Sequence, residues 1–171
     1  MLTVVSTTGD HVLACLPCQN TAAADPPARE RIVRTRHWRA AHAFTTGLPG
    51  WLVLLPTRHI TALTELDPEA AAELGPLLRD LSSALAEVLG CVKTYVVLLA
   101  EAEGFGHVHF HVIPRMPDQP AELRGPGIFQ MLGLPPEQCV PDAEMNRLAE
   151  RLSTALSTHH PARRPVPPDA N

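Results

Sequence analysis

The sequence has few aromatic residues and no long apolar run. Of its 171 residues, 4% are aromatic and 45% are hydrophobic, so one domain with a core of leucine, valine and alanine is the simplest expectation. No apolar stretch approaches the roughly 18 residues that a membrane-spanning helix needs. Residues 1–10 lack the charged start of a secretory signal. These absences predict a cytoplasmic protein that does not bind a membrane.

Positive charge and cysteine are also scarce. With histidine neutral, 14 Lys and Arg against 18 Asp and Glu give a formal net charge of −4. No basic block lies near either end, which argues against a nucleic-acid partner. Four cysteines are too few for a disulfide scaffold. The sequence has no internal repeat and no glycine-rich phosphate loop, so any phosphate binding has to be local.

Two helices are predicted from their end signals. Asp67-Pro68 is typical of a helix start and Gly90 of a helix end, and leucines recur between them at helical spacing. Pro76 lies inside this stretch, where we expect a kink or break. Asp142 begins the second predicted helix. The apolar face of that helix contains Met145, Leu148, Leu152, Ala155 and Leu156.

Extended segments flank the first helix. Residues 29–44 and 51–55 precede it, and the apolar run 93–100 is expected to pair as a hairpin with residues 106–115. Five arginines fall within residues 29–39, and a solvated strand face explains most of them. This order predicts an α+β fold, in which an antiparallel sheet of about five strands carries a long helix and a C-terminal helix on one side.

Prolines mark two segments without regular structure. Residues 114–141 contain seven prolines, which predicts an irregular segment, either an arm over the active site or a partner subunit, or a surface loop. We expect a single domain over residues 1–157 and a disordered, proline-rich tail over residues 158–171.

The most informative stretch is Gly106–Arg115, in which three histidines alternate with apolar residues. The alternation predicts a half-buried strand closed by Pro114, with His107, His109 and His111 on one face. A strand rises about 3.4 Å per residue, so the outer two imidazoles lie roughly 14 Å apart and all three cannot bind one ion. The three must have different roles. A row of merely solvated histidines is the less favoured alternative.

Cys15 and Cys18 form a Cys-x-x-Cys pair. The spacing suits a metal knuckle, a redox dithiol or two unligated cysteines. A thioredoxin-like dithiol needs a helix that opens at the cysteines, and we expect too little room for one before Asp25-Pro26. Zinc is favoured, because Cys₂His₂ sites are tetrahedral and histidines are available elsewhere. Cys91 and Cys139 have no ligand-spaced partner and are expected to be small buried residues.

The histidine stretch resembles the signature of the histidine triad (HIT) superfamily of nucleotidyl hydrolases and transferases. The run His-Val-His-Phe-His-Val-Ile-Pro-Arg carries the likeness, and Pro56-Thr57-Arg58-His59 is similar to the family's Pro-x-x-His at a strand end. The resemblance covers roughly residues 11–117. It implies a homodimer, a small nucleotide or phosphorylated substrate and, in the zinc-bearing subgroup, a structural zinc. The ligands that it implies here are Cys15, Cys18, His59 and His107.

The resemblance also implies roles for the remaining triad residues. The family's middle histidine attacks phosphorus to give a covalent intermediate, and here that residue is His109. A neutral imidazole suits this role, and its other ring nitrogen must then donate, for example to a backbone carbonyl. His111 would orient the phosphate or His109, and Arg115 is a candidate for charge stabilisation. A zinc-bound His107 cannot protonate the leaving group, so that proton comes from elsewhere or is not needed.

Two positions depart from the family pattern. Ala43 stands where many members carry an acidic or amide residue that holds the ribose, so no ribose contact is implied there. Glu103 stands four residues before His107, where many members have Gln. We place Glu103 among the substrate-binding residues, and its carboxylate would repel a polyphosphate unless it is turned away or paired with an arginine.

Two alternative functions stay open. In a zinc-dependent hydrolase, His107 and His109 would hold a catalytic metal with a bound water as nucleophile. A nucleotide-binding module would keep the fold without turnover. The Cys-x-x-Cys pair favours a closed structural zinc site over a catalytic one, because a closed site has no position for water.

Overall fold

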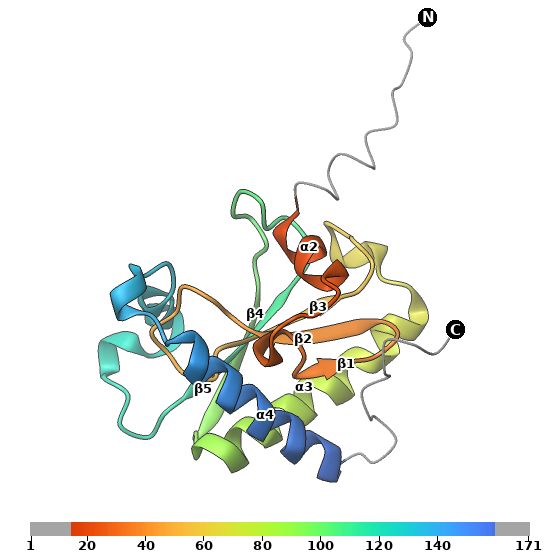
Figure 1. Ribbon diagram of the computed structural model, residues 1–171. Helices are drawn as coiled ribbons and strands as arrows, with labels where there is room; N and C mark the ends of the chain where they lie inside the picture. Colours follow the sequence, from red (N-terminus) through yellow and green to blue (C-terminus); the bar gives the residue numbers. More distant parts are fainter. Residues whose placement is uncertain (1–14, 160–171) are drawn as a thin grey trace, which may run out of the picture.

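The computed structural model describes residues 15–159 and forms one five-stranded antiparallel sheet (Figure 1). The strand order is β1-β2-β3-β5-β4. The strands are β1 (Val33–Arg34), β2 (Trp38–His42), β3 (Leu52–Pro56), β4 (Lys93–Leu98) and β5 (Phe110–Arg115). The predicted α+β class is therefore confirmed, and so is the predicted hairpin pairing, here between β4 and β5.

Helices cover both faces of the sheet. Two of them, α3 (Pro68–Leu89) and α4 (Asp142–His159), pack together on one face, as predicted. The short helix α2 (Leu16–Ala22) was not predicted. It lies against the other face, where Arg39 donates to the Thr21 hydroxyl. The short 3-10 helices are η1 (Ala28–Glu30), η2 (Leu63–Glu65), η3 (Ala121–Leu123), η4 (Gly125–Met131) and η5 (Pro136–Gln138).

The long helix α3 has the predicted ends. The Asp67 carboxylate accepts a hydrogen bond from the Ala70 backbone N–H at 2.8 Å, and Gly90 ends the helix with a φ of 70°. The sequence predicts a kink or a break at Pro76. The helix does not break there, because α3 is continuous across Pro76, and the kink stays a prediction. Proline removes one backbone hydrogen bond, and the buried leucines that follow keep the segment helical through packing.

The triad strand is shorter than its sequence pattern predicts. β5 begins at Phe110, so His107 and His109 precede it, and it runs through Pro114. The missing N–H of Pro114 is tolerated, because β3 pairs with β5 only as far as Val112. The backbone before Phe110 is free of strict strand geometry, and the first two imidazoles can therefore point in different directions.

The proline-rich segment packs on its own chain. Between Arg115 and Asp142 the structure has 3-10 helices, one isolated β-bridge from Leu132 to Thr46 and otherwise irregular backbone, as predicted. Its Met131 and Leu134 form backbone hydrogen bonds with the loop between β2 and β3. The same segment contributes Phe129 to the functional site described below, so it acts as an arm over that site.

Three smaller predictions have mixed outcomes. Cys91 is buried as expected, whereas Cys139 is only partly buried and its thiol donates to backbone carbonyls. The predicted tail lies outside the described residues, except for residues 158 and 159, which continue α4. No helix within residues 15–159 is long and apolar enough to cross a membrane.

His42 closes the turn between β2 and β3 from inside the protein. Its side chain is fully buried. Its Nε2 accepts a hydrogen bond from the Gly50 backbone N–H at 2.9 Å, and its Nδ1 donates to the Ala43 carbonyl at 2.7 Å. Burial lowers the pKa of His42 to about 4. Only the neutral ring can accept from Gly50, so proton binding disrupts the turn.

We predict that the free energy of unfolding falls as the pH falls from about 6.5 to about 4. Unfolded His42 has the ordinary pKa of 6.5 and binds the proton first, so stability that is complete above that pH is lost on acidification. At about 1.4 kcal/mol per pH unit, His42 contributes about 2 kcal/mol of the loss between pH 7 and pH 5. Urea titrations of wild type and His42→Gln at pH 7 and pH 5 measure this loss of unfolding free energy. Equal losses in the two proteins would contradict this assignment.

Candidate metal and catalytic site

Four metal-ligating side chains converge at the start of α2. The ligand atoms of Cys15, Cys18, His59 and His107 all lie within 4.8 Å of one another. The Cys18 Sγ is 3.3 Å from Nδ1 of His59 and 3.4 Å from Nδ1 of His107. The Cys15 Sγ is 3.8 Å from Nδ1 of His107. The four residues come from α2 and its N-cap, from the segment after β3 and from the segment before β5.

These distances fit a tetrahedral metal site. Metal–sulfur bonds of about 2.3 Å and metal–nitrogen bonds of about 2.1 Å put S and N about 3.6 Å apart across a tetrahedral ion. Burial lowers the pKa of His107 to about 4, and the nearby His59 adds to this. His107 is therefore neutral and able to act as a ligand. Two thiols and two imidazoles fill all four positions of such a site.

His109 lies next to this cluster with its proton position fixed. Its Nδ1 is 2.8 Å from the backbone carbonyl of His107. A carbonyl can only accept, so Nδ1 carries the proton and Nε2 has a free lone pair. A nucleophilic imidazole is expected to donate from its other ring nitrogen to a backbone carbonyl, and His109 makes such a hydrogen bond.

His111 has the opposite tautomer. The indole Nε1 of Trp51 donates to Nδ1 of His111 at 3.0 Å, with the two rings edge to face. An indole N–H is only a donor, so Nδ1 accepts and the proton of His111 is on Nε2. Burial lowers the pKa of His111 to about 4, with a smaller effect of His109. With ring centroids 4.9 Å apart, His109 offers a lone pair and His111 offers an N–H.

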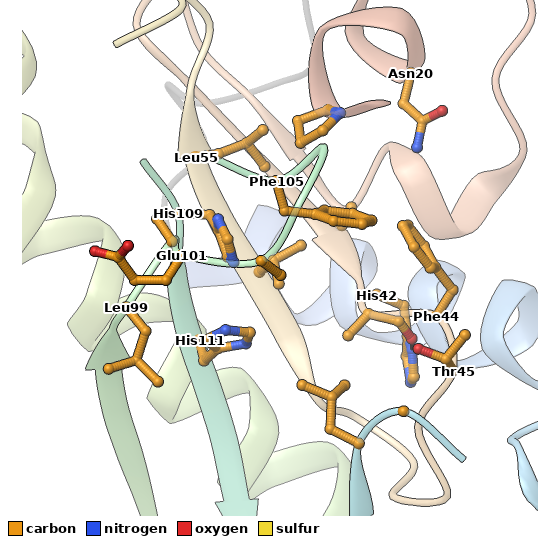
Figure 2. Close-up of a pocket in the computed structure, with 18 of the residues that line it drawn as sticks. Asn20, His42, Phe44, Thr45, Leu55, Leu99, Glu101, Phe105, His109 and His111 are labelled. Carbon is orange, nitrogen blue, oxygen red and sulfur yellow. Dashed lines mark hydrogen bonds between the residues drawn. The ribbon is translucent and has the colours of Figure 1, made fainter. Parts of the chain in front are cut away.

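A cavity of about 410 Å³ opens beside these two histidines (Figure 2). In Figure 2, His109 and His111 lie along one side of it, and Phe44 and Phe105 lie across from them. The two phenylalanine rings pack against each other with centroids 5.9 Å apart. Most of the remaining wall is also apolar. The cavity therefore combines a pair of histidines, one with a free lone pair and one with an N–H, with a large carbon surface.

A buried ion pair joins α2 to this cavity wall. Arg39 and Glu30 are 3% and 6% exposed, and a guanidinium N–H of Arg39 donates to the Glu30 carboxylate at 2.5 Å. Arg39 also donates to the Thr21 hydroxyl and the Pro17 carbonyl. All three nitrogens of the guanidinium thus donate hydrogen bonds within the protein. Glu30 holds Arg39 in place, and Arg39 in turn fixes α2, and with it the two cysteines, against β2.

Two residues predicted to bind substrate do not line the cavity. Arg115 lies four residues beyond His111 on β5, about 13 Å along the strand, and donates to the Met116 carbonyl. Glu103 is exposed on the loop before the triad, whereas Glu101 of the same loop is a lining residue. The structure therefore brings neither Arg115 nor Glu103 to the pair of histidines in the cavity.

Several site residues were missed from the sequence. The sequence predicts only an extended segment at Trp51. Val53 and Leu55, which follow it at a period of two, line the cavity, so this period places Trp51 on the cavity side. Arg39 was grouped with four neighbouring arginines, and no local pattern distinguishes it. Phe105 lies in a turn that carries no secondary-structure signal.

The segment after Cys15 has room for a helix, contrary to the prediction, although the cluster still favours a metal. A helix does open at the cysteines, because α2 needs only seven residues and has Cys15 as its N-cap. It ends before Asp25-Pro26. The two imidazoles that face the thiols distinguish this site from a redox pair, which needs no such ligands.

Comparisons with known proteins agree with this geometry. The model of the HIT domain matches residues 28–118, more than half of the chain. A Zn-bound histidine triad family protein from Mycobacterium smegmatis is 18% identical, with a TM-score of 0.63 over 88% of this chain and 99% of that one. A Hit-like protein from Bartonella henselae, described as involved in cell-cycle regulation, is 17% identical, with a TM-score of 0.63 over 90% and 99%.

A third similar structure belongs to a longer enzyme. It is a uridylyltransferase, 26% identical, with a TM-score of 0.60 over 84% of this chain and 45% of that chain. No curated protein matches the sequence. The structures below 25% identity establish a shared fold. They do not test the predicted homodimer or the predicted cytoplasmic location, which stay predictions.

We predict that Trp51→Phe disturbs the tautomer of His111. The substitution keeps an aromatic ring and removes the N–H that holds Nδ1 as an acceptor. Nitrogen NMR should find the proton on Nε2 in the wild type and a mixture of tautomers in the variant. Trp38→Phe is the matched control, because Trp38 is equally buried and donates to the Ala70 carbonyl on the helix side. An unchanged Nε2–H form in Trp51→Phe would contradict the assignment.

Proposed function

Because the chain belongs to the HIT domain family, we propose that it is a hydrolase or nucleotidyltransferase acting through a covalent intermediate on His109. The bond cleaved is a phosphoanhydride or phosphoramidate of a nucleotide-like substrate. The observation that carries the proposal is the pair of opposite tautomers, in which His109 offers a lone pair beside an N–H of His111. The likeness to a uridylyltransferase gives further support.

In the first step, Nε2 of His109 attacks phosphorus. The N–P bond forms while the bond to the leaving group breaks, and the leaving group departs with the electron pair and takes a proton from water. The Nε2–H of His111 donates to a non-bridging oxygen, which stabilises the charge of the transition state. Positive charge develops on the His109 ring, and the Nδ1–H bond to the His107 carbonyl stabilises it.

In the second step, an acceptor attacks phosphorus and releases His109. The N–P bond breaks, its electron pair returns to Nε2, and the proton of the acceptor passes to solvent. Water as acceptor gives hydrolysis, and a hydroxyl or phosphate group gives transfer. Splitting one displacement into two lowers the barrier of each.

We further propose that Cys15, Cys18, His59 and His107 hold a structural zinc ion. The donor set and its distances support this, and so does the zinc-bound neighbour from Mycobacterium smegmatis. The ion would tie the start of α2 to the segments that follow β3 and precede β5. The phosphorus chemistry described above needs only the chain's own histidines.

The alternative functions have less support. A catalytic zinc on His107 and His109 needs an open position, whereas four other donors complete a tetrahedral set and Nδ1 of His109 is bonded to a carbonyl. A binding module without turnover would need the cavity alone. It gives no reason for the free lone pair on Nε2 of His109.

We predict about one zinc per chain in metal-replete wild type, and less than about half of that in Cys15→Ala, because three ligands hold the ion more weakly. The variant should also unfold at a lower temperature, since binding of a structural metal stabilises the fold. Elemental analysis and thermal unfolding measure both. Cys139→Ala is the control, because Cys139 lies outside the cluster. Full zinc in Cys15→Ala would contradict the site.

We predict that His109→Ala and His109→Gly lose at least about a thousandfold in turnover, with zinc content and thermal stability unchanged, because only the nucleophile is removed. Nucleoside phosphoramidates, dinucleoside polyphosphates and nucleotide sugars form the assay panel. His37→Ala removes a histidine that does not line the cavity and should keep the wild-type rate. A loss below about tenfold, roughly 1.4 kcal/mol in the barrier, would rule out a nucleophilic His109.

A further inference from the structure

Most of the phenylalanines of this chain line one cavity. The sequence has four phenylalanines. Phe44, Phe105 and Phe129 line the cavity, and Phe110 packs against Trp38 on the other face of the sheet. The three lining rings come from the segment that follows β2, from the loop before the triad and from η4. Flat apolar walls of this kind suit a ring system with few polar groups.

The polar groups buried in the wall are already used within the protein. His42 is bonded through both ring nitrogens, and Arg39 is bonded to Glu30 and α2. Between His42 and Phe44 the wall is the methyl group of Ala43, which is 5% exposed. The vicinal hydroxyls of a ribose placed there would leave water without gaining partners, which weakens binding.

The uncharged polar side chains that remain, Asn20 and Thr45, are partly or fully exposed. They keep their contact with water, so they do not provide a buried partner for a sugar hydroxyl. Apart from His109 and His111, none of the lining side chains of the described residues therefore offers a buried, unused hydrogen-bonding group to a sugar hydroxyl.

The charge of the lining does not suit a polyphosphate. Within residues 15–159 the lining contains one cation, Arg39, and two carboxylates, Glu30 and Glu101, so its formal charge is 1 − 2 = −1 with histidine neutral. Arg39 is paired with Glu30. In Figure 2 the Glu101 carboxylate points away from the phenylalanine rings. The His111 N–H can serve one phosphorus centre, and the lining offers no free cation for a second one.

We propose that the substrate is a phosphoramidate monoester with a single negative charge, whose organic group is an apolar ring system and not a ribonucleoside. This rests on the covalent mechanism of the proposed function, because the reacting phosphorus is placed at Nε2 of His109, and it replaces the nucleotide-like substrate named there with a non-nucleoside ester. The N–P bond to His109 forms as the P–N bond of the substrate breaks, and the amine leaves with a proton from water. Water then restores His109 and gives the phosphate monoester.

The test compares two substrates on the zinc-loaded full chain. Naphthylmethyl phosphoramidate and adenosine 5′-phosphoramidate share the P–N bond and the CH₂–O–P linkage, and they differ in the organic group. We expect kcat/KM to be about tenfold or more higher for the naphthylmethyl compound. A ratio above about threefold supports the proposal, and a ratio of about threefold or less overturns it.

The 2′,3′-dideoxyadenosine compound separates the effect of the hydroxyls from that of the ring. Because the interior has no partner for them, removing both hydroxyls should raise kcat/KM above that of the adenosine compound. An equal or lower kcat/KM would overturn the proposal, because it would mean that the site accommodates or binds the hydroxyls.

Variants test the aromatic wall directly. Phe105→Ala removes one ring from a partly exposed loop position and should reduce the naphthylmethyl preference by about threefold or more. Leu63→Ala, at an exposed position of η2 outside the cavity, is the control and should keep it. An unchanged preference in a folded Phe105→Ala would overturn the proposal.

Failure of this inference is distinguishable from failure of the proposed function. If adenosine 5′-phosphoramidate is the better substrate and His109→Ala abolishes its turnover, the covalent mechanism stands and the inference about the organic group is wrong. If His109→Ala turns over both compounds at the wild-type rate, the proposed function fails, and the inference that rests on it fails too.

Discussion

The site depends on one hydrogen bond, from Nδ1 of His109 to the backbone carbonyl of His107. It fixes the proton of His109 and leaves Nε2 free to act. It is possible because β5 begins only at Phe110, so the carbonyl of His107 is available to a side chain two residues on. The imidazole of the same His107 faces the two thiols of the metal cluster. One residue thus links the cluster to the reactive histidine, through its side chain on one side and its backbone on the other.

The division of roles among three closely spaced histidines follows from what each imidazole faces. His107 meets sulfur, His109 meets a carbonyl, and His111 meets the indole N–H of Trp51. Three otherwise equivalent side chains thus differ in their surroundings: one lies in the candidate metal cluster, one is left with a free Nε2 lone pair and one with an Nε2 proton. The neighbours come from different elements, because α2 supplies the thiols and the segment that opens β3 supplies the indole. This arrangement accounts for a pair of histidines with opposite tautomers at the edge of an otherwise apolar cavity.

Local patterns predicted much of the fold and part of the site. Helix ends at Asp67 and Gly90 are determined by adjacent residues, so they could be identified from the sequence, and so could the triad. Pro76 does not break α3, because tertiary packing outweighs one lost hydrogen bond. Contacts between distant segments, such as Arg39 with α2 and Trp51 with His111, have no local signal. Arg115 is adjacent to the triad in sequence, yet an extended strand carries it out of reach.

The most direct test of this account is to trap the intermediate on the wild-type protein. Acid-sensitive adducts can be captured by rapid quenching at high pH during a single turnover, and then located by mass spectrometry and phosphorus NMR. The account predicts one phosphorus per chain, bound to Nε2 of His109, because Nδ1 is held by the carbonyl of His107. Turnover without any phosphorus on His109, or an adduct on His111, would contradict it.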